Sequence, residues 1–169
     1  MADEAQETVA PPFTAFNFRV EIDVEGVSQQ VCHAAFSECE GLEMSVAPKT
    51  IREGGDNTRQ IHLNGPVSYG QVTLRRGMTA NFDLWDWFDR VQSQGHLGLR
   101  ADAEIVMLAA DGRTEQVRFI LERCLPVKLR APSLNATDGL VAVEEMQLAY
   151  ERLSIRRPDG GGAGAAGGA

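Results

Sequence analysis

Alternating apolar and polar residues mark the N-terminal part of the chain as a two-faced β-strand. From Phe16 to Val24 every second residue is apolar, and the residues between them are polar or charged. Because successive side chains of a strand point to opposite faces, this segment predicts a half-buried strand. Glu25-Gly26 then supplies a turn, after which residues 30–36 can return as a second strand.

A hairpin is predicted in the second half of the chain. The apolar-rich segments 105–108 and 117–121 flank the pair Asp111-Gly112. Asp-Gly favours the tight turns that join antiparallel strands, because glycine adopts positive φ without strain. The two segments are therefore expected to pair directly.

Two more segments have strand-like patterns. Residues 71–76 predict a strand that ends at Gly77, and residues 140–150 predict the last strand of the fold. Within the last strand the adjacent glutamates Glu144 and Glu145 predict a β-bulge. Side chains next to each other on a strand face opposite ways, so these carboxylates cannot flank one substrate atom.

One helix is predicted between Thr79 and Gly95. Thr79 or Asn81 can cap its first turn, and apolar residues then recur at helical spacing. The predicted buried stripe comprises Leu84, Trp85, Phe88 and Val91. Trp87 lies about 200° from Trp85 on an ideal helical wheel. This position predicts either an exposed indole that contacts another subunit or one partly buried against a loop.

Residues 45–70 have weak periodicity and are interrupted by proline and glycine, so they predict a long loop or an extended arm. Long segments of this kind inside a compact domain are usually functional or disordered. The Gly-rich sequence Glu53 to Asn57 could approach an anion through its backbone. Its two acidic residues and the lack of a following lysine instead favour a turn in the arm.

The length and composition predict one domain with flexible ends. The chain has 169 residues, 43% of them hydrophobic, which is enough for a single core. We expect an acidic flexible leader at 1–12, a β-rich domain at 13–157 and a flexible Gly/Ala-rich tail at 158–169. The net charge of −8 disfavours nucleic-acid binding. No segment has the length and apolarity of a membrane span or a signal peptide, which predicts synthesis in the cytoplasm.

The residues that could carry chemistry form no recognisable site. Three cysteines without a paired motif predict neither disulfides nor a zinc site, and none of the three histidines lies in a catalytic motif. The cysteines are Cys32, Cys39 and Cys124, and the histidines are His33, His62 and His96. We therefore predict no catalytic residue, no metal site and no cofactor.

Several short motifs, in order along most of the chain, carry a resemblance to a known family. They run from Phe16-Asn17-Phe18-Arg19-Val20 through Phe36 to Leu42, Glu53 to Asn57, Val72 to Gly77, the Trp85 helix, Leu125 to Lys128, Pro132 to Ala136, and Glu144 to Leu153. In this order the sequence resembles the tail-tube (inner-tube) protein family of contractile phages and extracellular contractile injection systems. The acidic leader and the Gly/Ala tail lie outside the resemblance.

The resemblance implies a mainly β fold: a β-barrel-like sandwich of two antiparallel sheets with one flanking helix and a long extended arm. It also implies a non-enzymatic structural subunit that forms homohexameric rings stacked into a tube within a contractile particle made in the bacterial cytoplasm. The implied partners are copies of the chain, a sheath protein, baseplate or spike proteins, tube-terminating proteins and luminal cargo. Such particles are released from the cell or anchored to a membrane by other subunits.

Contacts between subunits are expected at the arm and at the end of the 71–76 strand. The hypothesis names Glu53, Gly54, Gly55, Asp56, Asn57, Arg75, Arg76, Gly77 and Trp87. Local solvation is the alternative interpretation of the arginine pair. Three other functions stay open: a type VI secretion ring protein, a ring at the baseplate end of the tube, and a small β-barrel hydrolase or ligand-binding module.

Overall fold

Alternation of apolar residues produces strands along most of the chain. The computed structural model describes residues 12–25, 32–34, 36–52, 54, 58–93, 98–137 and 139–158, with only the backbone at 32–34. Within this part lie twelve strands and one helix: β1 Phe18–Val24, β2 Cys32–Ala34, β3 Glu38–Glu40, β4 Met44–Val46, β5 Lys49–Ile51, β6 Ile61–Leu63, β7 Val67–Tyr69, β8 Gln71–Gly77, α1 Asp83–Gln92, β9 Ala101–Leu108, β10 Glu115–Arg130, β11 Val143–Ala149 and β12 Arg152–Arg156.

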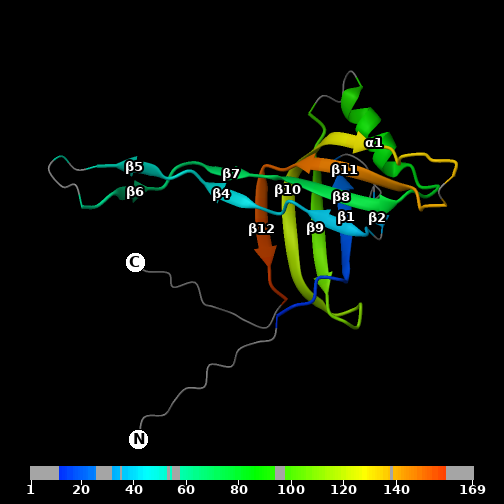
Figure 1. The fold of residues 1–169 in the computed structure, drawn as a ribbon, viewed down its shortest axis with the longest axis horizontal. Helices are drawn as coiled ribbons and strands as arrows, with labels where there is room; N and C mark the ends of the chain where they lie inside the picture. Colours follow the sequence, from blue (N-terminus) through cyan, green and yellow to red (C-terminus); the bar gives the residue numbers. More distant parts are fainter. Residues whose placement is uncertain are drawn as a thin grey trace, which may run out of the picture.

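The main strands form two layers that share β10. Neighbours follow the order β2-β1-β9-β10-β11-β8-β3, β12 also pairs with β10, and every pairing is antiparallel. We call β2, β1, β9, the start of β10 and β12 the first sheet, and the end of β10, β11, β8 and β3 the second sheet. Figure 1 shows the strands of the two sheets crossing each other, with α1 beside the second sheet. The predicted two-sheet sandwich with a flanking helix is confirmed.

Irregularities in β10 let it pass from one sheet to the other. Its register against β9 shifts between Leu121 and Cys124, where Arg123 has a φ of 54°. The Asp102 carboxylate accepts the Arg123 N–H at 2.8 Å, which satisfies the displaced backbone group. The bulge predicted at Glu144-Glu145 is wrong, because β11 pairs with β8 residue by residue.

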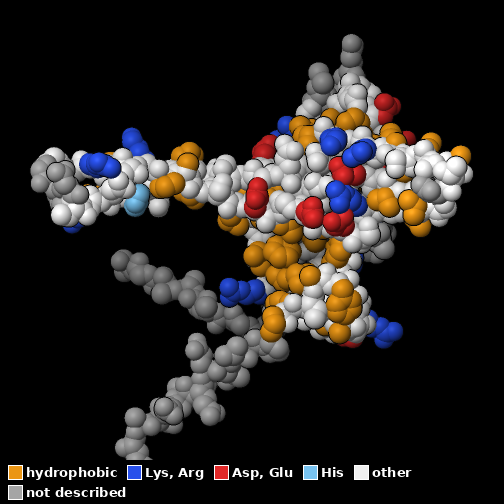
Figure 2. All heavy atoms as spheres, viewed as in Figure 1, with side chains coloured by type: hydrophobic (Ala, Val, Ile, Leu, Met, Phe, Trp, Pro, Cys, Tyr) orange, Lys and Arg blue, Asp and Glu red, His pale blue; other side chains and the backbone are white. Residues whose placement is uncertain are grey.

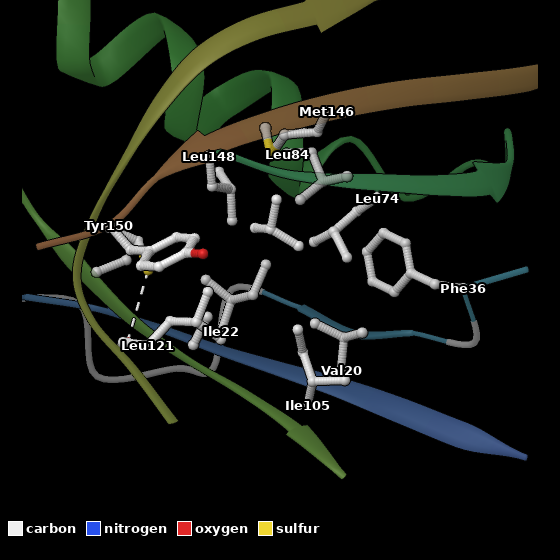
Figure 3. Packing of buried hydrophobic residues seen from close by; sticks show 14 of the residues in the cluster. Val20, Ile22, Phe36, Leu74, Leu84, Ile105, Leu121, Met146, Leu148 and Tyr150 are labelled. Atoms are coloured by element: carbon white, nitrogen blue, oxygen red, sulfur yellow. Dashed lines mark hydrogen bonds between the residues drawn. The ribbon is translucent and has the colours of Figure 1, made fainter. Parts of the chain in front are cut away.

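Apolar side chains from both sheets meet in one core (Figure 3). Val20 and Ile22 of β1 face Leu74 of β8 and Leu148 of β11, and each is at most 1% exposed. Because β1 is buried at alternate positions, its other face carries Arg19, Glu21 and Asp23. The first sheet thus has one apolar and one charged face.

The helix packs with a different face from the one predicted. Leu84 and Trp87 are its buried residues, at 0% and 1% exposed, whereas Trp85 is only half-buried. Leu84, Phe88 and Val91 fix the centre of the apolar stripe, and Trp87 lies about 60° from Leu84 on the ideal wheel while Trp85 lies about 100° away. The exposed indole expected at Trp87 is therefore a correction.

The predicted boundaries are partly tested by the described residues. The strand expected at 30–36 is β2, and the Asp111-Gly112 hairpin joins β9 to β10, with Gly112 at a φ of 66°. Apart from Pro12 and Pro158, the predicted leader and tail lie outside the described residues.

Candidate subunit-contact surfaces

The segment expected as a loop or arm is a β-hairpin that projects from the sandwich. β4 pairs with β7 and β5 pairs with β6, which makes two successive antiparallel ladders. We call residues 43–70 the arm. Figure 1 shows it extending well beyond both sheets, and no strand of either sheet pairs with it. Weak periodicity hid these strands because each is only three residues long.

Apolar pairs on the arm remain exposed. Val46 and Val67 are cross-strand partners, at 48% and 51% exposed, and Ile51 pairs with Ile61 at 42% and 38%. An isolated two-stranded ribbon is marginally stable in water, and exposed apolar patches mark sites of association. The arm therefore has the character of a segment that is buried against another chain. The signal that could have revealed it is the i, i+2 spacing of its apolar residues.

The base of the arm is fixed to the body. The Tyr150 hydroxyl accepts the Glu43 N–H at 3.1 Å and its own proton faces the carbonyl oxygens of Glu43 and Gly41, at 2.9 and 3.1 Å. Gly41 has a φ of 89°, and a Cβ there would lie 2.1 Å from the Gln71 carbonyl oxygen. Only glycine fits this close approach, so the direction in which the arm leaves the sandwich is set by local structure.

The tip residues named by the contact hypothesis are largely outside the described residues. Glu53, Gly55, Asp56 and Asn57 fall there. Gly54 is described: it is exposed, and a Cβ at this position would meet no atom within 4 Å. Steric need for glycine is therefore not visible at Gly54, and its role in contacts stays a prediction.

Arg75 lies on the outer face of the second sheet between two carboxylates. Its guanidinium donates to Glu38 at 2.6 Å and to Glu145 at 3.0 Å, from β3 and β11 respectively. These hydrogen bonds lower the pKa of Glu38 and Glu145 and raise that of Arg75. The side chain is 38% exposed, so it links three strands within the subunit and retains a surface for contact.

Arg76 points the other way, into the core. Its Nε donates to Glu144 at 2.5 Å and its Nη2 to the Asn81 carbonyl at 3.0 Å, while Trp85 donates its indole N–H to the same carboxylate at 2.8 Å. Arg76 and Glu144 are each 2% exposed. Both earlier interpretations of Arg76, subunit contact and surface solvation, are thus corrected: its side chain ties β8 to β11 and α1 inside the subunit.

The two remaining predicted contact residues differ in placement. Gly77 pairs with Val143 at the end of β8, and the nearest atom to a Cβ there is Val141 Cγ1 at 3.8 Å, so its role in contacts stays a prediction. Trp87 is buried against the core of its own subunit. Because no indole surface remains exposed, we do not include Trp87 among the contact residues.

A second apolar surface was missed by the sequence patterns. Leu134, Leu140 and Val141, in the connection between β10 and β11, are 89%, 84% and 79% exposed. Figure 2 shows apolar side chains at the end of the body opposite the arm and in the middle of the same face. A groove of about 320 Å³, lined by Phe18, Leu42, Ile105, Met107 and Phe119 among others, opens beside Glu38 and Glu40.

The thiols with described side chains are placed as inert residues. Burial raises the pKa of Cys39 and of Cys124 to about 12, so neither is a thiolate near neutral pH. Among the described residues no three His, Cys, Asp or Glu side chains are grouped to hold a metal ion. The one helix in the described part of the chain is too short to cross a membrane.

The sandwich and its projecting apolar hairpin define a β protein of the kind that associates with other chains through exposed surfaces. The family model of the T4-like virus tail tube protein gp19 matches residues 14–154. The chain therefore belongs to this family of tail tube proteins, as the sequence resemblance indicated.

Solved structures agree on the fold. A chain in the cryo-EM structure of the anti-feeding prophage baseplate is 24% identical with a TM-score of 0.77, and the match covers 88% of this chain and 97% of that one. A chain in the sheath–tube complex of an extracellular contractile injection system, in its extended state, is 22% identical with a TM-score of 0.74, and the match covers 94% and 100%. A comparison with curated proteins gave no significant match.

Proposed function

We propose that the protein is the repeated subunit of the inner tube of a phage-tail-like contractile injection system. Copies close into six-fold rings, and the rings stack into a hollow tube inside a sheath. The single observation that carries this proposal is the match to the tail tube family over residues 14–154. The similar chains come from baseplate and sheath–tube structures of contractile systems, which supports assembly beside sheath, baseplate and terminating proteins.

Exposed apolar surfaces of the subunit support self-association. The arm carries the uncovered pairs Val46–Val67 and Ile51–Ile61, and the connection before β11 carries Leu134 and Leu140. Burying apolar surface contributes roughly 25 cal/mol per Å², so surfaces of this kind favour association once copies are present at high concentration. We infer that the arm reaches an adjoining subunit.

A structural role accounts for the residues better than catalysis. A hydrolase of this size would need a nucleophile and a base within reach of one pocket. The two thiols with described side chains are buried with raised pKa values, and His62 lies on the exposed arm. We therefore propose that the function resides in repeated contacts between subunits and not in turnover of a substrate.

Assembly of the purified protein tests the proposal. We expect rings or tubes by negative-stain electron microscopy at high protein concentration. Replacing Val46 and Val67 together by serine should abolish them while the monomer unfolds at an unchanged temperature, because the pair is outside the core. Replacing Ser45 and Ser68 on the other face of the same ladder by alanine is the matched control, since their hydroxyls lie 2.8 Å apart and contact only each other.

Two outcomes would count against this function. A wild-type chain that stays monomeric at every concentration, and that is absent from sheathed particles, would contradict self-assembly. Equal loss of tubes in the serine-face control would show that the apolar pair has no special role. Copy number per particle, measured by quantitative mass spectrometry, separates the repeated body subunit from a ring present once at the baseplate end.

A further inference from the structure

The charged face of the first sheet carries rows of like charge in register. On this face Glu21 of β1 lies directly opposite Glu104 of β9, and Asp23 lies opposite Asp102. Arginines form the next row, because Arg19 and Arg118 both face Val106 and Arg118 lies opposite Arg156. Like charges directly opposite each other destabilise a sheet. The pattern therefore points to a use other than stability of the subunit.

The second sheet provides the contrast within the same molecule. Its outer face has a row in which Glu38, Arg75, Glu145 and Arg130 alternate in sign across four strands. On the first sheet, compensation instead runs along or diagonally between strands, as in the pairs of Arg118 with Glu104 and with Glu115. The rows of the first sheet consequently remain a basic band beside an acidic band.

This face is poorly suited to burial against another chain. The centres of protein interfaces are depleted of charged residues, whereas the arm and the 131–142 connection present apolar side chains. Desolvating a row of like charges is costly without a partner of the opposite sign. In an assembly that covers the apolar surfaces, the charged face is the one that stays in contact with water.

The edges of the first sheet determine which way the face points in a ring. In the described residues β2 pairs only with β1, and β12 pairs only with β10, so each leaves one edge free. Pairing of these edges between copies would continue the sheet around a closed ring. The second sheet, with α1 and the arm, lies on the core side and fits the larger radius outside. The charged face then points inward.

We propose that the face carrying Arg19, Glu21, Glu104, Arg118 and Arg156 is the hydrated wall of the channel, divided into a basic and an acidic band. The inference rests on the proposed tube function and adds the chemistry of the wall. Acidic groups outnumber basic ones on this face, so the wall disfavours a polyanion such as nucleic acid. It suits hydrophilic polypeptide, whose charges of both signs find opposite charges on the wall while apolar adhesion is absent.

Single cysteines in assembled tubes test the location of the wall. Ile120→Cys lies opposite Glu104 in the acidic band, Arg156→Cys lies opposite Arg118 in the basic band, and Asp86→Cys on α1 is the exterior control. Electron microscopy first verifies that each variant forms tubes, and unsubstituted tubes give the background from native cysteines. A protein-linked maleimide should label the two wall positions only in dissociated subunits, but Asp86→Cys in both states.

Small thiol reagents of opposite charge test the bands. In tubes, the ethylammonium methanethiosulfonate should react faster than the ethylsulfonate at Ile120→Cys, and the order should reverse at Arg156→Cys. A preference of roughly fivefold corresponds to one charge at short range in water, and it should shrink in high salt and on adding Glu104→Gln beside Ile120→Cys. Both preferences together support the proposal.

The failures can be told apart. If tubes form but the protein-linked maleimide labels Ile120→Cys within them, the face is on the exterior and the inference is overturned although the tube function stands. The same sign preference at both positions in tubes would overturn the bands. If the unsubstituted chain forms no rings or tubes under any condition, both the proposed function and the inference fail.

Discussion

Removal of the Arg76 guanidinium should unfold the subunit more readily than removal of any exposed charge. In Arg76→Ala the Glu144 carboxylate keeps the Trp85 indole N–H at 2.8 Å but loses its cation, in a site where both charged residues are 2% exposed. The Asn81 carbonyl also loses its donor. A buried carboxylate is left without a compensating charge, and this is the origin of the expected effect.

Its magnitude follows from the burial. Breaking a buried ion pair by removing one partner costs about 3–5 kcal/mol, which is a large part of the roughly 5–15 kcal/mol that stabilise a typical domain. For a chain of this length the melting temperature should fall by about 6–20 °C. Arg75→Ala is the matched control one residue away. Its side chain is 38% exposed, and its pairs should contribute at most about 1 kcal/mol each.

The assay is equilibrium urea unfolding at pH 7, followed by circular dichroism at concentrations where the protein is monomeric. A third variant, Arg76→Met with Glu144→Leu, removes both charges and should recover most of the stability lost in Arg76→Ala, because replacing a buried pair by apolar residues is often neutral. A loss below about 1 kcal/mol in Arg76→Ala, or a loss equal to that of Arg75→Ala, would refute the reasoning.

Three further predictions concern single contacts. Tyr150→Phe removes the hydroxyl at the base of the arm and should cost about 1 kcal/mol in urea unfolding and reduce tube yield; unchanged values of both would contradict this anchor. The pKa of Glu145 is lowered by Arg75, so its stabilising effect is present above the unfolded value of 4.5 and is lost as pH falls through the lower folded value. Unfolding below pH 4.5 should therefore show a smaller acid loss in Arg75→Ala than in the unmodified chain. Cys39 and Cys124 should resist Ellman's reagent at pH 8 until urea unfolds a variant whose third cysteine is serine; rapid reaction in the folded state would disprove their burial.

Local patterns predicted the elements that have a repeating signal. The alternation around Val20 yielded β1, and Asp111-Gly112 yielded the β9–β10 hairpin. The continuation of β10 to Arg130 was missed because it contains Pro126, and proline normally ends an internal strand. Its neighbouring register shift, between Pro126 and Lys128, is a tertiary feature that no local pattern encodes.

The contact surfaces were harder to predict than the fold. The arm was recognised as an extension, but its exposed pairs depend on which strands meet, and short segments do not reveal that. Arg76 seemed a surface residue because arginine is seldom fully buried, and only its opposition to Glu144 across β8 and β11 reveals its role. Trp87 was misplaced because the helical stripe was centred on Trp85 and not on Leu84.

Electron microscopy of the purified full chain tests the central claim most directly. Helical reconstruction of material assembled at high concentration should show hollow tubes of stacked six-fold rings, with the arm of each copy against its neighbour. A protein that remains monomeric at every concentration, alone and when mixed with its sheath protein, would contradict the assignment as a tube subunit.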